Sequence, residues 1–525
     1  MGRSLDLSRA AERSAARAPR HRASGWWRRE PVDLVADAAT AHAARAAVTD
    51  RDGTLTYAEL DAAVDVAAAS LSGRGVARGD AVLLLAANDL PSVVAVHAVL
   101  RAGGVAMVAP TNAGAAQIAD ICAATQPVVV VAPRDAVDLD GADTWPTPAD
   151  LLAGDAAAGS PVVRRDPDEP TIVIFTSGTT ARPKGVVHSL NTMLAATRNY
   201  IDAAHLTVDD NLFVISPLAS VTGLIQAITV APSLGARVTL ESRFDAPSTL
   251  DFLVETSATF FGGPDLLLDR VLTEAAARGL DSVPISAVYL GGSMLDPRIL
   301  ARAEHEYGIV VLRAYGSSEA PISTSSERGE PEAVRLADDG RALGGVEVRI
   351  GSTNDAAECC LSGAHLFLGY TAPEDDEEAF HTDDDGIDWL CTGDLAELRD
   401  GRLKVFGRIK DVVIRNGLKI PLAEVDGMVG ALEGVEQCAG YGVPDDTTGE
   451  RLAVAVRRRP GAEVGFDDIV EGLVAAGAAR WKIPEELVLW DEPFPETPSG
   501  KVRRNALDAG AAGRPRTLAP RLRDP

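Results

Sequence analysis

The chain has 525 residues, which is too long for one compact domain and predicts two to four units. Hydrophobic residues make up 46% and charged residues 24%, as in an ordinary globular protein with a large core. The formal net charge of −26 argues against broad binding to nucleic acid or to an anionic membrane, because the long-range field repels both.

The cysteines predict neither a disulfide framework nor a metal site. The five of them (Cys122, Cys359, Cys360, Cys391 and Cys438) lack paired or metal-ligand spacing and fit thiols in a reducing cytoplasm. No apolar run reaches the roughly 18 residues that a membrane span needs, so a cytoplasmic location is expected. Residues 1–30 are rich in Arg and Ala without an apolar core segment, so we expect a poorly ordered lead-in rather than a secretory signal, and an organelle-targeting role stays open.

Strands and helices alternate along the chain. A short strand and a helix start are predicted over Thr54–Leu60, a buried parallel strand over Ala81–Leu85 and a helix over Pro91–Arg101. Further strands are predicted at Gly103–Pro110, Pro127–Ala132, Thr171–Phe175, Leu212–Ile215, Arg237–Leu240 and Ala287–Leu290. This order predicts an α/β fold with parallel-rich sheets flanked by helices.

A domain boundary is predicted near Gly407–Asp411. Asp400-Gly401 before it is typical of a hairpin turn, and about a hundred residues with their own strands and helices follow it. We therefore divide the chain into a lead-in (1–30), a large N-terminal domain (31–408), a small mobile α+β C-terminal lid domain (409–510) and a flexible tail (511–525).

A hydroxyl-rich loop follows the strand at Thr171–Phe175. Its sequence, from Thr176 to Gly185, is TSGTTARPKG. Glycines allow backbone N–H groups to approach an anion, hydroxyls and amides form an anion-binding concavity, and Lys184 supplies a positive charge for phosphate. A polar surface loop is the simpler reading of such residues taken singly, but ten of them in this order favour a phosphate site. It is not a Walker loop, because Gly185 follows the lysine.

The run TSGTTARPKGVVH closely resembles the phosphate loop of the adenylate-forming superfamily, which contains acyl-CoA synthetases, peptide-synthetase adenylation domains and luciferases. The resemblance extends from about Trp26 to Arg504. Its further landmarks are the segments GGS (291–293), YGSSE (315–319), WLCTGD (389–394), GRIKD (407–411) and PSGKV (498–502). Within the superfamily, the chain is most similar to the cyclohexanecarboxylate and short- to medium-chain acyl-CoA ligase branch.

This resemblance implies a role for each matching residue. Catalytic roles are implied for Thr176, Lys184, Glu319 and Lys501, with Glu319 and Thr176 also holding Mg²⁺. Contacts with ATP or AMP are implied for Thr176, Ser177, Gly178, Thr179, Thr180, Lys184, Gly291, Gly292, Ser293, Tyr315, Gly316, Ser317, Ser318, Asp394 and Arg408. Lys410 is implied as the hinge and Gly417 as the loop on the thiol side.

These residue types suit the activation of a carboxylate by ATP. The carboxylate and the α-phosphate are both anions, and a lysine such as Lys501 stabilises the negative charge that spreads between them in the transition state. Glu319 with Mg²⁺ neutralises the departing pyrophosphate. Asp394 accepts hydrogen bonds from two neighbouring ribose hydroxyls.

The chain departs from the family pattern at three positions. Ala181 replaces a loop glycine and requires a backbone φ below zero. Ser318 replaces a threonine and keeps the hydroxyl. Ser220 stands where relatives commonly have His or an aromatic residue that walls the acyl pocket, so we transfer no catalytic role to it.

The residues around the expected acyl pocket disfavour an amino acid as the substrate. No acidic residue lies between Ser216 and Ser233, and an ammonium buried without a counter-charge is costly. An aliphatic or alicyclic acid is favoured instead, although core packing explains the apolar residues equally well. The pocket residues expected from the resemblance are Ser220, Val221, Gly223, Phe261 and Gly262.

We therefore predict an AMP-forming acid–thiol ligase that uses ATP, Mg²⁺ and CoA, with fatty acid metabolism as its setting. A stand-alone enzyme that loads a separate carrier protein in secondary metabolism is the first alternative. A non-catalytic nucleotide-binding regulator is the second, although intact Glu319, Asp394 and Lys501 disfavour it. No nucleic-acid partner is expected, and a homodimer stays open.

Overall fold

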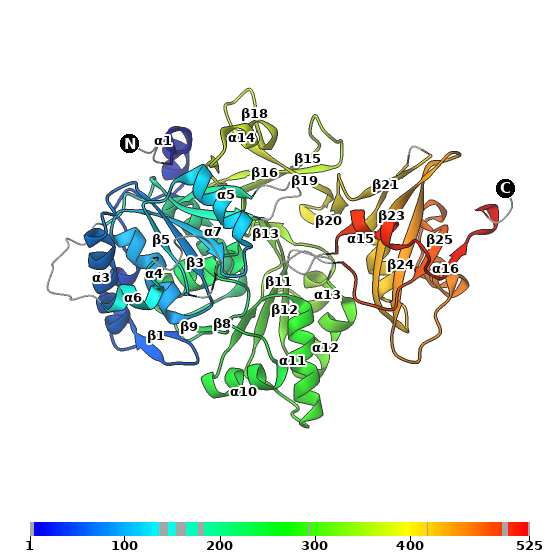
Figure 1. Ribbon diagram of the computed structural model, residues 1–525, viewed down its shortest axis with the longest axis horizontal. Helices are drawn as coiled ribbons and strands as arrows, with labels where there is room; N and C mark the ends of the chain where they lie inside the picture. Colours follow the sequence, from blue (N-terminus) through cyan, green and yellow to red (C-terminus); the bar gives the residue numbers. More distant parts are fainter. Residues whose placement is uncertain are drawn as a thin grey trace.

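The computed structural model describes residues 5–134, 136, 145–153, 164–176, 183–291, 295–416, 418–495 and 502–522. Two sheets form a large N-terminal region, and a third forms a smaller C-terminal region, drawn in orange and red in Figure 1. The predicted α/β fold with a large and a small domain is confirmed.

The largest sheet is mixed and runs through most of the N-terminal region. Its order is β15-β16-β19-β20-β14-β13-β12-β11-β10-β8-β9-β1-β2, with β18 paired to β19. The central strands from β12 to β1 are parallel, and the strands on both sides of them are antiparallel. The strands are β1 (Ala46–Thr49), β2 (Thr54–Thr56), β8 (Asn211–Val214), β9 (Arg237–Leu240), β10 (Phe260–Gly262), β11 (Ala287–Gly291), β12 (Val310–Tyr315), β13 (Thr324–Ser325), β14 (Arg341–Ala342), β15 (Val346–Ile350), β16 (Glu358–Gly363), β18 (Phe380–Thr382), β19 (Asp388–Arg399) and β20 (Arg402–Arg408).

The second sheet has the order β17-β7-β6-β4-β3-β5, with β3 to β6 mutually parallel. Its strands are β3 (Ala81–Ala86), β4 (Val105–Pro110), β5 (Val129–Val131), β6 (Pro170–Thr176), β7 (Lys184–Ser189) and β17 (Gly369–Tyr370). Every residue of β3 is buried, as expected for a parallel strand covered on both faces.

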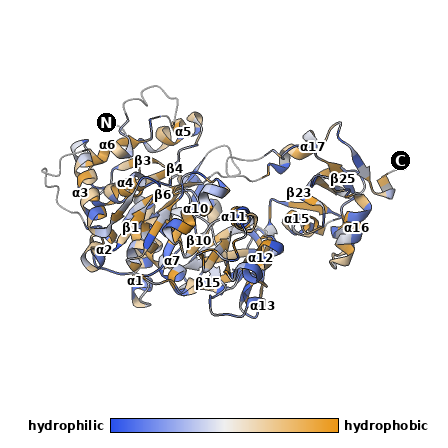
Figure 2. Ribbon diagram, turned by 90° about the horizontal axis from the view of Figure 1, so that it is seen from below, coloured by the Kyte–Doolittle hydropathy of each residue, from blue (hydrophilic) through white to orange (hydrophobic). Residues whose placement is uncertain are grey.

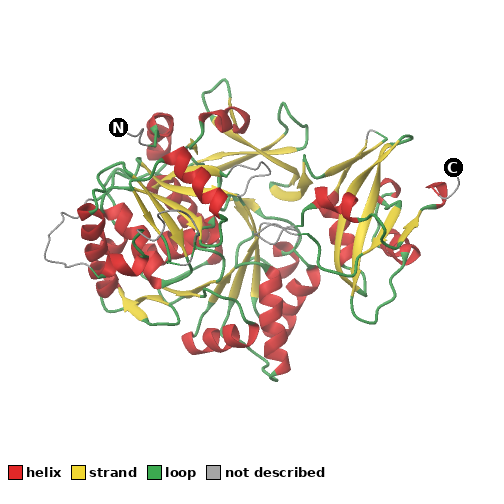
Figure 3. Cartoon of the chain, in the orientation of Figure 1, coloured by secondary structure: helices red, strands yellow, loops and turns green. Residues whose placement is uncertain are grey.

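Helices cover and separate these two sheets, as Figure 3 shows in red and yellow. The helices of the N-terminal region are α1 (Ser8–Ala23), α2 (Leu34–His42), α3 (Tyr57–Gly73), α4 (Leu90–Arg101), α5 (Ala115–Thr125), α6 (Pro148–Leu152), α7 (Leu190–Ala204), α8 (Val221–Leu224), a π-helix η2 (Ile225–Val230), α9 (Ala231–Leu234), α10 (Ala246–Thr256), α11 (Asp265–Ala277), α12 (Pro297–Tyr307), α13 (Glu332–Arg335) and α14 (Pro373–Ala379).

Strand alternation divides the core into layers. Val82 and Leu84 of β3 share one cluster with α4, α7 and strands β8 and β9, whereas Leu83 and Leu85 face α1 and α5. On the far side of the largest sheet, Phe213 packs beneath α10 and α11. The hydrophobic residues, orange in Figure 2, therefore lie in successive layers of helix and sheet.

The lead-in differs from its prediction. Instead of a poorly ordered segment, residues 8–23 form α1, because Ala10 and Ala18 are buried in the core beneath it. Arg17 donates to the carbonyl oxygen of Phe367 at 2.7 Å and pairs with Asp388 at 2.9 Å. The segment was predicted to be poorly ordered because it is rich in arginine. In the structure, arginines such as Arg17 are the residues that attach it to the rest of the protein.

The third sheet lies beyond Arg408. Its order is β22-β21-β24-β25-β26, with β23 paired to β24. Its strands are β21 (Val412–Arg415), β22 (Leu418–Pro421), β23 (Val435–Asp445), β24 (Gly449–Arg458), β25 (Glu486–Leu489) and β26 (Arg516–Leu518), with the helices α15 (Leu422–Gly430), α16 (Phe466–Ala475), η3 (Arg480–Lys482), η4 (Arg504–Ala506), α17 (Leu507–Gly510) and η5 (Pro520–Leu522).

The two regions are joined by the residues between β20 and β21, where the sequence predicts the hinge. Part of the predicted flexible tail is ordered, since β26 pairs with β25. Among the described residues, no helix has the length and apolar composition needed to cross a membrane.

Candidate active site

Expected site residues gather at the carboxyl ends of parallel strands. In the largest sheet β11 ends at Gly291, β12 ends at Tyr315 and β10 ends at Gly262, and these three strands are adjacent. In the second sheet β6 ends at Thr176. Ligands of open α/β sheets bind outside this edge, so the strand order itself predicts where a nucleotide is bound.

Two glycines that are expected to contact the nucleotide are required by close backbone approaches. A Cβ atom at Gly291 would lie 2.6 Å from the carbonyl oxygen of Ala314, its neighbour in register on β12. A Cβ atom at Gly316 would lie 2.5 Å from the backbone nitrogen of Ile322. Both contacts are too short for any side chain, which explains why glycine stands at these positions.

Asp394 is held between two predicted nucleotide-binding residues. Its Oδ2 atom accepts a hydrogen bond from the Tyr315 hydroxyl at 2.7 Å, and its Oδ1 atom lies 3.0 Å from Nε of Arg408. Asp394 and Arg408 face each other in register on β19 and β20. Burial raises the pKa of the Tyr315 hydroxyl well above its ordinary value, so this tyrosine stays a neutral donor. The structure thus brings together a ring, a carboxylate and a guanidinium that the sequence places far apart.

A second group surrounds Lys184, the lysine of the phosphate loop. Its Nζ atom pairs with Asp375 of α14 at 2.9 Å and lies 5.1 Å from the ring centre of Tyr370. The Tyr370 hydroxyl donates to Oε1 of Glu319 at 2.8 Å. Tyr370 therefore connects the expected phosphate lysine with the expected metal ligand.

Glu319 has the chemistry of a magnesium ligand. Its carboxylate is half-buried, and such hard oxygen atoms, with the hydroxyl of Thr176, are the donors that Mg²⁺ prefers. Burial and then the charge of Glu319 raise the pKa of the Tyr370 hydroxyl, so Tyr370 donates to Glu319 and does not compete as an anion. Glu319 and Thr176 are the residues that would hold the ion, which would neutralise phosphate charge.

His188 supports the turn that carries Ser318 and Glu319. Its Nε2 atom bonds to the carbonyl oxygen of Ser318 at 2.7 Å, and its Nδ1 atom lies 3.0 Å from the Thr192 hydroxyl. Burial lowers the pKa of His188 to about 4, so the ring is neutral near pH 7. The hydroxyl of Ser317 accepts from the backbone N–H of Glu319 at 3.2 Å and fixes the turn beside it.

The predicted acyl-pocket residues separate into two groups. Ser220 caps α8, accepting from the N–H of Gly223 at 3.2 Å, and a Cβ atom at Gly223 would lie 2.3 Å from the carbonyl oxygen of Pro217. Val221 packs against the cluster that contains Phe260. Phe261 instead belongs to the cluster beneath α10 and α11, on the other face of the sheet. Val221 therefore packs on the side of the sheet that Phe260 faces, and Phe261 packs on the other side, because adjacent strand residues point to opposite faces.

Gly262 completes this region through its contact with the π-helix. A Cβ atom there would lie 2.4 Å from Oε1 of Gln226, a fully buried residue of η2. The Nε2 atom of Gln226 donates to the carbonyl oxygen of Thr222 at 2.9 Å. Any larger residue at 262 would therefore displace the side-chain amide of Gln226.

Several predicted residues lie outside the described part of the chain. They are Ser177, Gly178, Thr179, Thr180, Ala181, Gly292, Ser293, Gly417 and Lys501. Lys410, the predicted hinge residue, is exposed between β20 and β21.

Three residues of the site were not predicted from the sequence. Tyr370 and Asp375 lie far from the phosphate loop in the chain, and their types alone carry no signal for it. His188 ends the run TSGTTARPKGVVH, so its position was visible but its buried bond to Ser318 was not.

The family comparison agrees with this arrangement. The AMP-binding enzyme family matches residues 35–371, and the C-terminal domain of AMP-binding enzymes matches residues 424–501. The chain belongs to the AMP-binding enzyme family. The predicted membership of the adenylate-forming superfamily is confirmed.

Individual relatives match almost end to end. A 3-[(3aS,4S,7aS)-7a-methyl-1,5-dioxo-octahydro-1H-inden-4-yl]propanoyl:CoA ligase of Rhodococcus jostii is 29% identical, covering 88% of this chain and 95% of its own. Triostin synthetase I of Streptomyces triostinicus is 29% identical, covering 94% and 96%. The solved structure of ATP-bound MatB from Rhodopseudomonas palustris superposes with a TM-score of 0.80 at 26% identity, covering 92% and 99%.

These relatives support an acid–thiol ligase that forms AMP, as predicted from the sequence. ATP, Mg²⁺ and CoA are the substrates and ion that CoA ligases of this family use, in agreement with the predicted set. The acid that this chain activates is not given by any of the relatives.

Proposed function

We propose that the chain activates an aliphatic or alicyclic carboxylic acid with ATP and transfers the acyl group to the thiol of CoA. In the first step a carboxylate oxygen bonds to the α-phosphorus and pyrophosphate leaves. In the second step the thiol sulfur bonds to the acyl carbon, its proton is lost and AMP leaves. The observation that carries this proposal is Asp394, held by Tyr315 and Arg408 at the carboxyl edge of the parallel strands.

The residues of the site divide the work of the first step. Asp394 would accept the ribose hydroxyls, and the ring of Tyr315 would lie against the base. Lys184 pairs with Asp375 in the structure. When ATP binds, its ammonium group would exchange this carboxylate for the phosphates, which are also anionic. Glu319, oriented by Tyr370, would hold Mg²⁺ beside the leaving pyrophosphate.

The proposed acid follows from the walls of the acyl region. Val221 is partly exposed beside apolar core residues, and the buried residues of η2 include no charged side chain. An ammonium group there would be buried without a partner, which is costly. A short- to medium-chain or ring-containing acid without a charged substituent fits this surface.

Both steps involve residues beyond the described ranges. We propose that Lys501 acts on the α-phosphate during adenylation, and that rotation about Lys410 then replaces it with the Gly417 loop at the thiol. A cytoplasmic location and a homodimer remain predictions from the sequence.

The test is an assay of the purified protein with ATP, Mg²⁺, CoA and a panel of carboxylic acids, following AMP and thioester. The expected result is AMP and acyl-CoA in equal amounts with aliphatic or alicyclic acids, and none with α-amino acids. Nucleotide binding without turnover of any acid in a panel that spans these classes would contradict the proposal and favour a regulator.

A carrier-protein acceptor is the second candidate, because a relative of similar identity is named triostin synthetase I and not a CoA ligase. Replacing CoA by a phosphopantetheinylated carrier protein distinguishes the two. Acyl transfer to the carrier with none to CoA would establish the alternative.

A further inference from the structure

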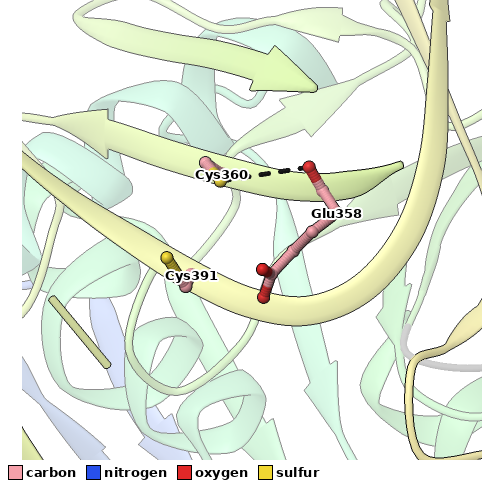
Figure 4. Close-up of side chains that lie close together, drawn as sticks. All are labelled: Glu358, Cys360 and Cys391. Atoms are coloured by element: carbon pink, nitrogen blue, oxygen red, sulfur yellow. Dashed lines mark hydrogen bonds between the residues drawn. The ribbon is translucent and has the colours of Figure 1, made fainter. Parts of the chain in front are cut away.

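Cys360 and Cys391 form a thiol pair across two neighbouring strands. They are directly opposite each other in the antiparallel register of β16 and β19. Their sulfur atoms lie within 4.8 Å of one another, and Figure 4 shows both turned toward the gap between the strands. Cys360 is fully buried, whereas Cys391 is partly exposed, so a molecule as small as water can approach the pair from the side of Cys391.

The backbone is already arranged for a covalent bond. Residues directly opposite on antiparallel strands have Cα atoms about 4.5 to 5.5 Å apart. Disulfides span Cα separations of about 4.4 to 6.8 Å, and the ordinary separation of directly opposite residues falls within that range. Cys359 points to the opposite face of β16 and joins another cluster, which leaves it out of the pair.

A guanidinium group lies on the other side of Cys360 from Cys391. Arg349 of β15 is the register partner of Cys360 on its other side, and it lies 4.4 Å over the ring of Trp389. A hydrogen bond with the Cys391 thiol, and a weaker one with Arg349, lower the pKa of the Cys360 thiol although burial opposes them. The bond with Cys360 raises the pKa of Cys391. Of the two thiols, Cys360 is therefore the one that ionises first.

A metal ion is less suited to this place, although the carboxylate of Glu358 is the third group of the cluster. Its Oε1 atom accepts from the N–H of Gly393 at 2.8 Å, and its Oε2 atom accepts from Ser352 and Asn354. The carboxylate is thus engaged by the protein, and the positive charge of Arg349 repels a second cation.

We propose that Cys360 and Cys391 are a site of reversible oxidation, forming a cross-strand disulfide when a peroxide reaches them. The sulfur that has lost its proton attacks one peroxide oxygen, the O–O bond breaks, and the departing hydroxide takes up that proton to form water. The second thiol sulfur then displaces the oxygen of the sulfenic acid as a second water. One peroxide and two thiols give one disulfide and two waters.

The disulfide would link β16 covalently to β19, the strand that carries Asp394, the proposed ribose-binding carboxylate. Cys391 and Asp394 share β19, and the hydroxyl of Thr392 between them already donates to the carbonyl oxygen of Cys359 at 2.7 Å. Oxidation would add a covalent link to this hydrogen-bonded strand pair without using any residue of the proposed reaction.

The test is peptide mapping of the reduced, full-length protein after treatment with hydrogen peroxide and alkylation of the remaining thiols. The expected result is one cross-linked peptide pair joining Cys360 to Cys391, two hydrogen atoms lighter than the free peptides and released by dithiothreitol. Recovery of both cysteines as alkylated or sulfinic forms, or a link through Cys359, would overturn the proposal.

Two variants sharpen the result. Cys391→Ser should abolish the link and leave a sulfenic acid at Cys360 that dimedone traps, whereas Cys359→Ala should keep the link. Oxidised wild-type protein should also unfold a few degrees higher than reduced protein, because the closed loop restricts the unfolded chain. Stoichiometric Zn²⁺ binding to the reduced protein that prevents the link would replace this proposal with a metal site.

Discussion

The side chain of Tyr370 lies between opposite charges, with Lys184 over its ring and Glu319 at its hydroxyl. Its ring and its hydroxyl therefore have separable functions. The ring covers the lysine, while the hydroxyl fixes the direction of a carboxylate that would otherwise rotate freely.

Replacing Tyr370 by Phe tests the hydroxyl alone. Loss of one hydrogen bond to a charged group costs about 1.5 kcal/mol or more, so the KM for Mg·ATP should rise roughly tenfold. The Mg²⁺ concentration for half-maximal activity should rise with it, while the KM for the acid stays unchanged. Steady-state kinetics with titrated Mg²⁺ measures this, and Tyr307→Phe, which removes a hydroxyl bonded to Leu272 on distant helices, is the matched control.

His188 gives the site a dependence on pH. Its pKa is about 4 in the folded protein, below the ordinary value of 6.5 that the unfolded chain retains. Between these values the unfolded state binds more protons, so the stability that neutral His188 provides is complete above about pH 6.5 and is lost as the pH falls toward 4. The loss for this residue is on the order of 3 kcal/mol.

We expect His188→Gln to keep a hydrogen-bond donor to Ser318 but to lose the titration. The variant should be less stable than the wild type at pH 7.5, and its denaturation midpoint should fall less between pH 6.5 and 4.5. Thermal unfolding across this range is the measurement. An identical pH dependence in both proteins would show that His188 does not titrate in this way.

At the scale of elements, helix α1 attaches the start of the chain to a distant region. Arg17 reaches Asp388 and the carbonyl oxygen of Phe367, and Arg13 reaches Asp376 at 3.2 Å. The ring of Phe380 lies 4.1 Å from the guanidinium of Arg13. These contacts hold α14, and so Asp375, in place beside Lys184.

Arg17→Met should therefore weaken both stability and nucleotide binding. Removing a mostly buried guanidinium leaves Asp388 and a carbonyl short of partners, which costs roughly 2 to 4 kcal/mol. The melting temperature should fall by several degrees, and the KM for ATP should rise modestly. Arg9→Met, at an exposed position of the same helix, should change neither quantity.

The sequence was sufficient to predict elements that depend only on neighbouring residues in the chain. The apolar run at Ala81–Leu85 and the turn at Asp400-Gly401 were predicted from periodicity and turn residues, and both are present, with positive φ values of 51° and 75° at the turn. The disposition of Phe260 and Phe261 was not predicted, because the arrangement of the strand in the sheet decides which of the two rings packs on which face. The order of α1 was missed for a similar reason, since its partners lie more than 300 residues away.

At the scale of the whole molecule, the proposed site draws on two regions that meet at residues 409–411. In the described arrangement, Lys419 of β22 pairs with Asp355, and Arg298 donates to the carbonyl oxygen of Gly430 at 3.1 Å. The small region is therefore placed by polar contacts rather than by a shared core, as expected for a domain that rotates.

Lys501→Ala tests the proposal that the C-terminal region adopts one orientation for adenylation and another for thioester formation. The variant should lose acyl-adenylate formation by a factor of 100 or more, on the order expected for removing one charge from the transition state. It should retain thioester formation when a chemically prepared acyl-adenylate is supplied. Single-turnover assays of each half-reaction measure both, with the exposed Lys404→Ala as control. Equal loss of both half-reactions would contradict alternation.

The hairpin of β19 and β20 makes the nucleotide site sensitive to chain length. Asp394 and Arg408 meet because the pairing of β19 with β20 shifts by one residue between Leu395 and Ala396, which brings two residues at unequal distances from the exposed turn at Asp400-Gly401 opposite each other. Adding one residue at such a turn is ordinarily harmless, but here it would shift one strand and send one partner to the wrong face. Natural or engineered insertions should thus be tolerated in other surface loops and rejected in this one, although neither Asp400 nor Gly401 is a residue of the proposed site.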